Sequence, residues 1–163
     1  MGLDHNLENI NIAKYKYPNI DFNLIDLNFI NNNIKIKFDF ITCFETLEHV
    51  GSINNAIQNL INFKKNTNSI IIISVPIEIG LIGLIKFIFK LFKGYKLSEL
   101  KPVPSNFQYF QSIFKGDISK YRNDNEGWGT HFGFDYRKID EFLITNHIKY
   151  SSTNSFTTRF YII

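Results

Sequence analysis

The stretch FDFITCFETLEHV, residues 38–50, decides the expected fold of this chain. It begins with an apolar and aromatic run, Phe38 to Cys43, which predicts a buried strand. Two acids and a histidine (Glu45, Glu48 and His49) follow this strand directly. In an open α/β sheet, polar groups that follow a buried strand gather at the carboxyl edge, where ligands bind. We therefore expect a site at the end of this strand.

Patterns typical of helices and strands alternate on both sides of this stretch. Residues 53–63 place apolar side chains on one helical face, and Ser52 stands where a helix N-cap is expected. Residues 69–75 read SIIIISV, a β-branched run typical of a strand covered on both faces in a parallel sheet. In chain order we expect a helix over 6–17, strands over 20–25 and 38–43, a helix over 53–63, a strand over 69–75, a helix over 136–146, and a hairpin of strands over 148–156 and 157–163.

This order predicts one α/β domain over residues 1–163. Alternating strands and helices build a mostly parallel sheet, and the final hairpin closes it with an antiparallel strand. A chain of 163 residues is long enough to bury the core of one domain. Residues 78–130 interrupt the alternation, and we interpret them as an insertion or lid.

The composition restricts the partners and the compartment. The net charge is +3 and the lysines are scattered along the chain, so we expect no nucleic-acid partner. The single Cys43 excludes an internal disulfide and favours a reducing compartment. The sequence shows no signal-peptide pattern, so we expect a cytoplasmic location. Nothing in the composition indicates an oligomeric state.

Three segments resemble the class I S-adenosylmethionine-dependent methyltransferases, in order and at fitting separations. They are GLDHNLENINIAKYKYPNIDFNLID (2–26), FDFITCFETLEHV (38–50) and IIIISVP (70–76). The tail HFGFDYRKIDEFL (131–143), followed by two strands, fits the ending of this family. The resemblance implies a Rossmann-like fold and S-adenosylmethionine as the cofactor.

The resemblance also implies residues that bind the ribose of the cofactor. Asp4, followed by His5, occupies the position of the acid that holds the ribose hydroxyls in this family. A carboxylate suits that role because it accepts two hydrogen bonds from a vicinal diol. The alternative is that Asp4 only caps the helix that begins near Asn6.

Further cofactor contacts follow from the same resemblance. Asp26 and the adjoining Leu27 match the positions that contact the adenine, and Phe44 and Glu45 match those that line the methionine side. The alternative for Asp26 is a turn acid, because aspartate side chains often bond to backbone two residues ahead.

The segment ETLEH resembles the same tract in ubiquinone-biosynthesis O-methyltransferases and small-RNA 2′-O-methyltransferases. Glu45, Glu48 and His49 stand at i, i+3 and i+4, so one helical turn groups them. The resemblance implies catalytic roles for His49, His131 and Glu48, with a histidine as general base. In the alternative, Glu45, Glu48, His49 and His131 hold a divalent metal beside the acceptor hydroxyl. In a third interpretation this segment only packs in the loop after the strand.

The first strand of the family and its Gly-rich loop have no counterpart here. Met1 and Gly2 match the region of the second strand, so roughly 40 residues are absent by comparison with a βαβ unit. The family's first strand lies between its second and fourth, so we expect two strand edges without partners. The interpretations are a truncated enzyme, a mis-assigned start, a chain completed by a partner and a decayed copy. As given, the chain is expected to bind the cofactor poorly.

The insertion stands where this family places its acceptor-binding elements. Residues 81–96 read LIGLIKFIFKLFKGYK, and Lys86, Lys90 and Lys93 fall on one helical face. A lid or dimer helix is the favoured interpretation; the alternative is a helix on the inner membrane surface that admits a lipid-linked acceptor through residues 81–93. The expected activity is methylation of an oxygen on a small-molecule, glycan or lipid-linked acceptor. The rival function is a non-catalytic methyltransferase-like subunit.

Overall fold

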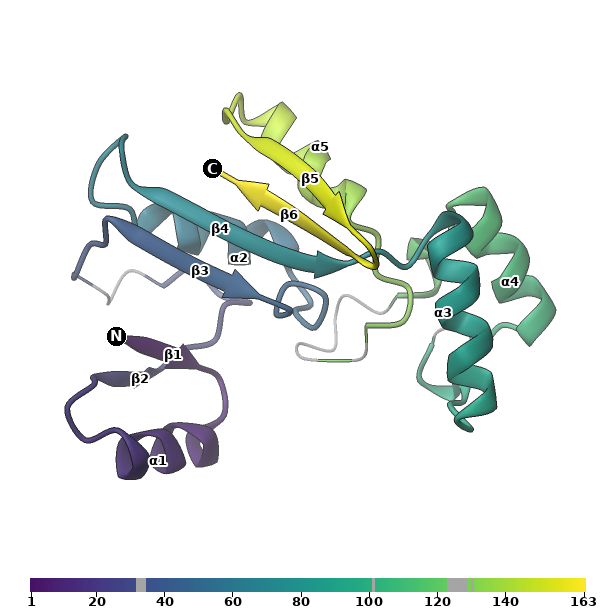
Figure 1. The fold of residues 1–163 in the computed structure, drawn as a ribbon, viewed down its shortest axis with the longest axis horizontal. Coiled ribbons are helices and arrows are strands. Elements are labelled where there is room, and N and C mark those ends of the chain that lie inside the picture. The colour runs from purple at the N-terminus through teal and green to yellow at the C-terminus, as the bar shows by residue number, and fades with distance from the viewer. Residues whose placement is uncertain (32–34, 101, 123–128, 130) are drawn as a thin grey trace.

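The computed structural model describes residues 1–31, 35–100, 102–122, 129 and 131–163 (Figure 1). Two sheets are present in these residues. The first pairs β1 (Gly2–Asp4) with β2 (Phe22–Leu24) in parallel, connected by α1 (Leu7–Lys16). The second has the order β3-β4-β6-β5 and consists of β3 (Phe40–Phe44), β4 (Ile70–Pro76), β6 (Thr158–Ile162) and β5 (Ser151–Ser155).

The second sheet is mixed, as the sequence predicts. β3 and β4 run parallel with Cys43 opposite Ile73, whereas β6 runs antiparallel to both β4 and β5. The predicted α/β fold with a parallel sheet and a closing antiparallel strand is therefore confirmed.

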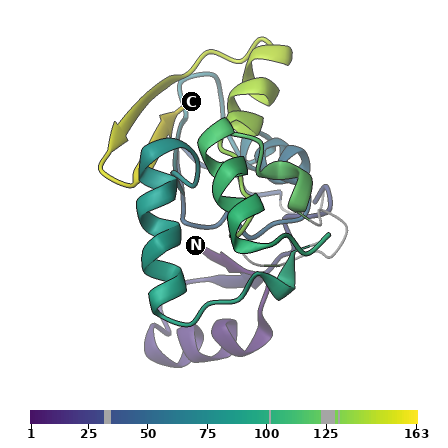
Figure 2. The same cartoon turned by 90° about the vertical axis from the view of Figure 1, so that its right-hand side faces the viewer.

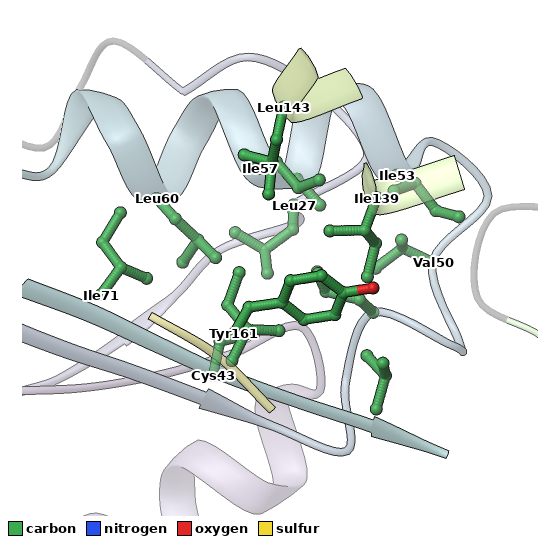
Figure 3. Close-up of a cluster of buried hydrophobic side chains, with 14 of the residues drawn as sticks. Leu27, Cys43, Val50, Ile53, Ile57, Leu60, Ile71, Ile139, Leu143 and Tyr161 are labelled. Carbon is green, nitrogen blue, oxygen red and sulfur yellow. The ribbon is translucent and has the colours of Figure 1, made fainter. Parts of the chain in front are cut away.

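The main core lies between this sheet and two helices, α2 (Ile53–Asn62) and α5 (Arg137–Thr145). Figure 3 shows Ile57 and Leu60 of α2 above the strands, with the Tyr161 side chain between helix and sheet. Apolar residues recur every three or four positions along α2, so one face of the helix is buried. The hydroxyl oxygen of Ser52 accepts a hydrogen bond from the Asn55 N–H (3.3 Å), which confirms the predicted N-cap.

Two buried asparagines attach the segment after β2 to α2. The side-chain oxygen of Asn28 accepts hydrogen bonds from the N–H groups of Gly51 (2.7 Å) and Ser52 (3.0 Å). The amide nitrogen of Asn59, which is 0% exposed, donates to the carbonyls of Leu27 (3.2 Å) and Phe29 (2.8 Å). Because these groups are buried, their bonds fix where β1, β2 and α1 sit beside the second sheet.

The insertion forms a second core of its own. It contains α3 (Gly80–Phe92), α4 (Asn106–Lys115) and two short 3₁₀ turns (Leu97–Glu99 and Ser119–Tyr121). Figures 1 and 2 show α3 and α4 side by side at one end of the molecule. Gly83 permits this packing, because a Cβ there would meet the Glu78 carbonyl and the Ile113 side chain. Within the described residues, no helix is long and apolar enough to cross a membrane.

The strand predicted over 148–156 begins later than the sequence suggests. The N–H of Ile148 bonds to the Leu143 carbonyl (2.9 Å), and His147 has φ +54°. This is a helix-terminating motif in which a left-handed residue follows the last turn. It keeps the backbone at 146–148 attached to α5, so β5 begins only at Ser151.

The two sheets do not join in the described part of the chain. β1 pairs with β2 and β3 pairs with β4, but β1 and β3 do not pair with each other. Figure 1 shows β1 and β3 running in the same direction on either side of a gap. These are the two strand edges that the family resemblance implies.

Candidate active site

A cavity of about 560 Å³ lies between β1 and β3 and extends to their carboxyl ends. Its lining divides into two parts. Polar side chains come from residues at or just after the strand ends: Asp4, His5, Glu45, Thr46 and His49. Apolar side chains come from β1, β3, α2 and residues beside them: Leu3, Phe38, Phe40, Ile41, Leu60 and Phe63. The cavity therefore has a polar end beside the strand termini and an apolar region between the strands.

Asp4 lines the polar end and also supports the start of α1. Its Oδ1 accepts a hydrogen bond from the Asn6 N–H (2.8 Å), and its Oδ2 accepts one from the Asn9 side-chain amide (3.1 Å). The imidazole of His5 lies 3.5 Å from the same carboxylate. Each carboxylate oxygen can accept more than one hydrogen bond, so these contacts leave capacity for a diol. Both interpretations of Asp4 from the sequence fit this geometry.

The structure separates Asp26 from the cavity. The Asp26 Oδ1 accepts hydrogen bonds from the backbone and side-chain N–H groups of Asn28, both at 2.9 Å. That geometry is the turn arrangement that was the alternative for this residue. Leu27 and Ile25, its two neighbours, do line the cavity. Leu27 therefore lies at the cavity, whereas the Asp26 carboxylate bonds to Asn28; both adenine contacts stay predictions.

The backbone turns sharply at the end of β3, beside the cavity. Phe44 and Glu45 both line it, and Glu45 has φ +47°, which is rare for a residue with a side chain. The Ser74 hydroxyl of β4 donates to the Glu45 carboxylate (2.9 Å) and contacts the Glu45 N–H (3.3 Å). Backbone strain of this kind is commonly found at functional sites. The conformation is one that the sequence pattern does not indicate.

Glu48 is buried beside this turn and is only 2% exposed. Burial raises the pKa of its carboxyl from the ordinary 4.5 to about 7. Among the described residues its Oε2 has no hydrogen-bond partner, and its Oε1 lies 3.8 Å from Nε2 of His49. A carboxyl with this pKa can exchange a proton near neutral pH.

His49 and His131 come together at this end of the sheet. Nδ1 of His49 lies 2.8 Å from the carbonyl oxygen of Gly129, and the two imidazole rings meet edge to face with centroids 5.9 Å apart. A carbonyl only accepts, so Nδ1 of His49 carries the hydrogen and Nε2 of the neutral ring is free to take a proton. Burial lowers the pKa of His131, and the Lys90 ammonium lowers it further.

A buried ion-pair group on the insertion lies next to His131. The Glu78 carboxylate forms ion pairs with Lys86 and Lys90. Each lysine Nζ lies 2.7 Å from one of its oxygens. The Lys90 ammonium also lies 4.7 Å from the centre of the Phe132 ring, on which His131 stacks. Two of the three lysines expected on one helical face therefore point to Glu78. Sequence reasoning missed Glu78, although its place two residues after β4 was a usable signal.

The described residues hold no group of three or more His, Cys, Asp or Glu side chains placed to bind a metal. Glu45 bonds to Ser74, whereas Glu48 and His49 face one another near His131. Two further cavity residues, Asn9 and Thr46, were also missed by sequence reasoning. Their positions, one turn into α1 and just after β3, were the available signals.

Comparison with known proteins supports the same fold. No protein-family model matches the sequence. Over 90 residues the chain is 28% identical to "Putative methyltransferase 235L" of Invertebrate iridescent virus 6, which covers 55% of this chain but only 33% of that protein. The crystal structure of an S-adenosylmethionine-dependent methyltransferase from Clostridium acetobutylicum ATCC 824 superposes with a TM-score of 0.58 at 12% identity, over 98% of this chain and 72% of that one. The chain therefore has the Rossmann-like fold of the class I S-adenosylmethionine-dependent methyltransferases.

Proposed function

We propose that this chain is the cofactor-binding part of a methyltransferase that uses S-adenosylmethionine to methylate an oxygen of a small-molecule, glycan or lipid-linked acceptor. The observation that carries the proposal is the polar end of the cavity, which lies at the carboxyl ends of β1 and β3. Asp4 and Glu45 line its polar end, and the His49–His131 pair adjoins it. Ligands of open α/β sheets bind at this edge.

The residues present fit the cofactor. A cavity of about 560 Å³ lies within the range of small-molecule sites, roughly 300–1,000 Å³. Asp4 would hold the ribose hydroxyls, Ile25 and Leu27 would contact the adenine, and Phe44 and Glu45 would line the methionine side. When bound, S-adenosylmethionine supplies a methyl group on a positively charged sulfur. The negative charge of Asp4 and Glu45 favours a cationic ligand at this end.

The acid–base residues account for the proton of the acceptor. In methyl transfer the acceptor oxygen would take the methyl group as the bond from sulfur to that carbon breaks, leaving a neutral thioether. The hydroxyl proton would then pass to Nε2 of His49, because the contact of Nδ1 with the Gly129 carbonyl places the ring hydrogen on Nδ1. The Oε1 of Glu48 lies 3.8 Å from this Nε2, so an ionised Glu48 carboxylate would stabilise the His49 imidazolium. His131, held neutral by its surroundings, is the second group able to take a proton.

A second candidate function rests on the unpaired edges of β1 and β3. In this alternative the chain is a methyltransferase-like subunit that is not catalytic alone and acts when another chain completes it. The curated relative is far longer than this chain, which covers 33% of its length. Activity of the whole protein is therefore a proposal in either case.

Cofactor binding tests the first proposal directly. Saturation-transfer NMR with S-adenosylhomocysteine detects millimolar binding, and we expect transfer to the adenine and ribose protons. Asp4→Ala is expected to reduce this signal more than fivefold. Asp4→Asn, which retains an acceptor for the Asn6 N–H, is expected to do the same without loss of α1. The control is Asp21→Ala. Asp21 directly precedes β2, whereas Asp4 pairs with Leu24 at the other end of that strand, so this substitution is expected to leave the signal unchanged.

Three results would count against the proposal or its details. Absence of saturation transfer would refute a cofactor site in this chain. An equal signal from the Asp4 and Asp21 variants would remove Asp4 from that site. Micromolar binding in a calorimetric titration would contradict the expectation that the chain as given binds weakly.

A further inference from the structure

One face of α3 is apolar and exposed along the whole helix. Five large side chains recur there at helical spacing: Leu81, Ile85, Ile88, Phe89 and Phe92. The Leu81 side chain at the start of the helix is 73% exposed, and that of Phe92 at its end is 84% exposed. A surface helix of a globular domain normally turns such a row of side chains toward the core. This face of α3 is instead left uncovered by the described residues of the chain.

The other two faces of α3 already have partners. Leu84 and Phe87 fill the core of the insertion. Lys86 and Lys90 bond to the buried carboxylate of Glu78, which keeps their charges away from the apolar face. The uncovered face therefore carries no charged side chain of its own helix, and contact with an apolar phase would not require any lysine of α3 to lose its partner.

α4 adds a second exposed apolar row. Phe107, Phe110 and Phe114 recur at spacings of three and four residues and are exposed, whereas Tyr109 and Ile113 are buried in the core of the insertion. Figure 2 shows α3 and α4 side by side and in front of the rest of the chain when this end of the molecule faces the viewer. We call the exposed rows of the two helices the α3–α4 surface. Neighbouring exposed apolar side chains of this kind indicate a contact surface.

Positive charge accompanies this surface. Residues 78–116 contain six lysines and two acids, a net charge of +4, whereas the rest of the chain has a net charge of −1. Glu78, one of the two acids, is buried. Lys93 and Lys96, which follow α3, and Lys115, the last residue of α4, are exposed. The electrostatic complement of this end of the molecule is therefore an anionic surface.

Apolarity and charge together select the occupant. An isologous contact with a second copy would place the same lysines of both chains around one interface, where like charges repel. A bilayer that contains anionic lipid matches both properties, because apolar side chains enter the acyl boundary while lysines meet the headgroups. α3 has only 13 residues, too few to span a bilayer, so contact with the surface of the membrane is the arrangement that fits.

We propose that the α3–α4 surface binds the surface of a bilayer that contains anionic lipid, with both helices lying along the membrane. Phe92 and Phe114 enter the acyl boundary, and Lys93, Lys96 and Lys115 contact lipid phosphates. The proposal goes beyond the proposed function and does not depend on it, because its test contains neither cofactor nor acceptor.

Co-sedimentation of the chain with sucrose-loaded vesicles tests the apolar contact. The vesicles contain equal parts of phosphatidylcholine and phosphatidylglycerol, and the chain is expected to bind them. Phe92→Ser and Phe114→Ser are each expected to lower the partition coefficient at least fivefold, because binding strength scales with the buried apolar area. The matched control is Phe156→Ser, which changes an exposed phenylalanine between β5 and β6 and is expected to leave binding unchanged. All three side chains are exposed, so unchanged circular dichroism is expected for each variant.

A second set of variants tests the charge. Vesicles of phosphatidylcholine alone are expected to bind the chain at least tenfold more weakly than the anionic vesicles. The double variant Lys93→Gln, Lys96→Gln is expected to lose at least fivefold on anionic vesicles and to be unchanged on neutral ones. The control Lys14→Gln, Lys16→Gln removes two exposed lysines of α1 and is expected to bind as the unchanged chain does.

An environment-sensitive dye on a single cysteine reports which face enters the lipid. In a Cys43→Ser background, nitrobenzoxadiazole attached after Phe92→Cys is expected to brighten at least twofold with anionic vesicles. The same dye attached after Thr153→Cys, on β5, is expected not to change.

Four results would overturn the proposal. The first two are absence of binding to anionic vesicles and equal binding to neutral vesicles. The third is an equal loss for Phe92→Ser and Phe156→Ser, which would show that any exposed phenylalanine contributes. The fourth is dimerisation in light scattering that Phe92→Ser abolishes, which would assign the α3–α4 surface to a second copy.

Discussion

The imidazole rings of His49 and His131 meet edge to face, with centroids 5.9 Å apart and planes at 82°. His49 follows β3, and His131 lies before α5 and stacks on Phe132 with ring centroids 5.4 Å apart. The Lys90 ammonium of α3 lies over the same Phe132 ring. His49 is thus positioned by the end of β3, whereas the charge of Lys90 on the insertion lowers the pKa of His131. A substitution in the insertion is therefore expected to change the pKa of His131.

Replacing Lys90 is expected to raise the pKa of His131. Burial is the largest cause that lowers this pKa and the positive charge of Lys90 is the next, so Lys90→Gln removes the second-largest cause. Titration of the His131 ring carbons by NMR is the measurement. Lys93→Gln, which changes an exposed lysine directly after the same helix, is the control and is expected to have no effect. A pKa that does not move would show that the Lys90 charge is screened at His131.

Glu48 is expected to make the chain less stable as pH rises. Its folded pKa of about 7 exceeds its ordinary 4.5, so the folded state holds the proton more tightly than the unfolded chain. The free energy of unfolding is therefore insensitive to Glu48 below pH 4.5, falls between pH 4.5 and 7, and is level above. The fall is at most about 3 kcal/mol.

Urea unfolding across this pH window measures the effect. Glu48→Gln is expected to abolish the fall, because glutamine does not ionise. Glu141→Gln, an exposed residue of α5, is expected to retain it. Identical pH profiles for the wild-type chain and Glu48→Gln would mean that Glu48 is not responsible.

The Cys43 thiol is expected to be inert in the folded chain although it lines the cavity. Burial raises its pKa to about 12, and only the thiolate reacts with disulfide reagents. Labelling with Ellman's reagent at pH 8 is expected to be at least about a thousandfold slower than in guanidinium. A Cys43→Ser, Thr153→Cys double variant, whose thiol is exposed, is expected to label at the unfolded rate. Rapid native labelling would show that solvent reaches Cys43 through the cavity.

Removal of the Asn59 side chain is expected to loosen the attachment of the β2 segment to α2. Asn59→Ala leaves the buried carbonyl of Leu27 and that of Phe29 without their donor, which costs about 3 kcal/mol. Urea unfolding followed by circular dichroism measures the loss. Asn54→Ala, an exposed asparagine of the same helix, is expected to change stability by less than about 0.5 kcal/mol. Equal effects of the two substitutions would contradict the role given to Asn59.

Local signals predicted the elements well where one short segment contains the whole cause. Ser52 caps α2, as predicted, because an N-cap needs only its own hydroxyl and an N–H three residues ahead. The polar residues after β3 reach a cavity for a similar reason, since parallel strands deliver their carboxyl ends to one edge. The late start of β5 was missed because the helix-ending motif at His147 overrides strand propensity.

Contacts between distant segments were not predictable in the same way. Glu78 looked like an ordinary acid after a strand, and only the packing of α3 brings Lys86 and Lys90 to it. The sequence pattern showed nothing of the positive φ of Glu45, because it depends on Ser74 in the neighbouring strand. Asp26 matched a cofactor position in the sequence, yet its carboxylate bonds to Asn28 and lies outside the cavity lining.

The amino-acid order by itself determined the succession of strands and helices and the parallel and antiparallel parts of the sheet. Periodicity and capping act over a few residues, so they can be read from the chain directly. Only the tertiary structure decided that His49 meets His131 and that Glu48 is buried with a raised pKa. It also decided that the cavity between β1 and β3 is apolar along the strands and polar at their ends. Burial and long-range distance cause these properties, and both depend on how the whole chain packs.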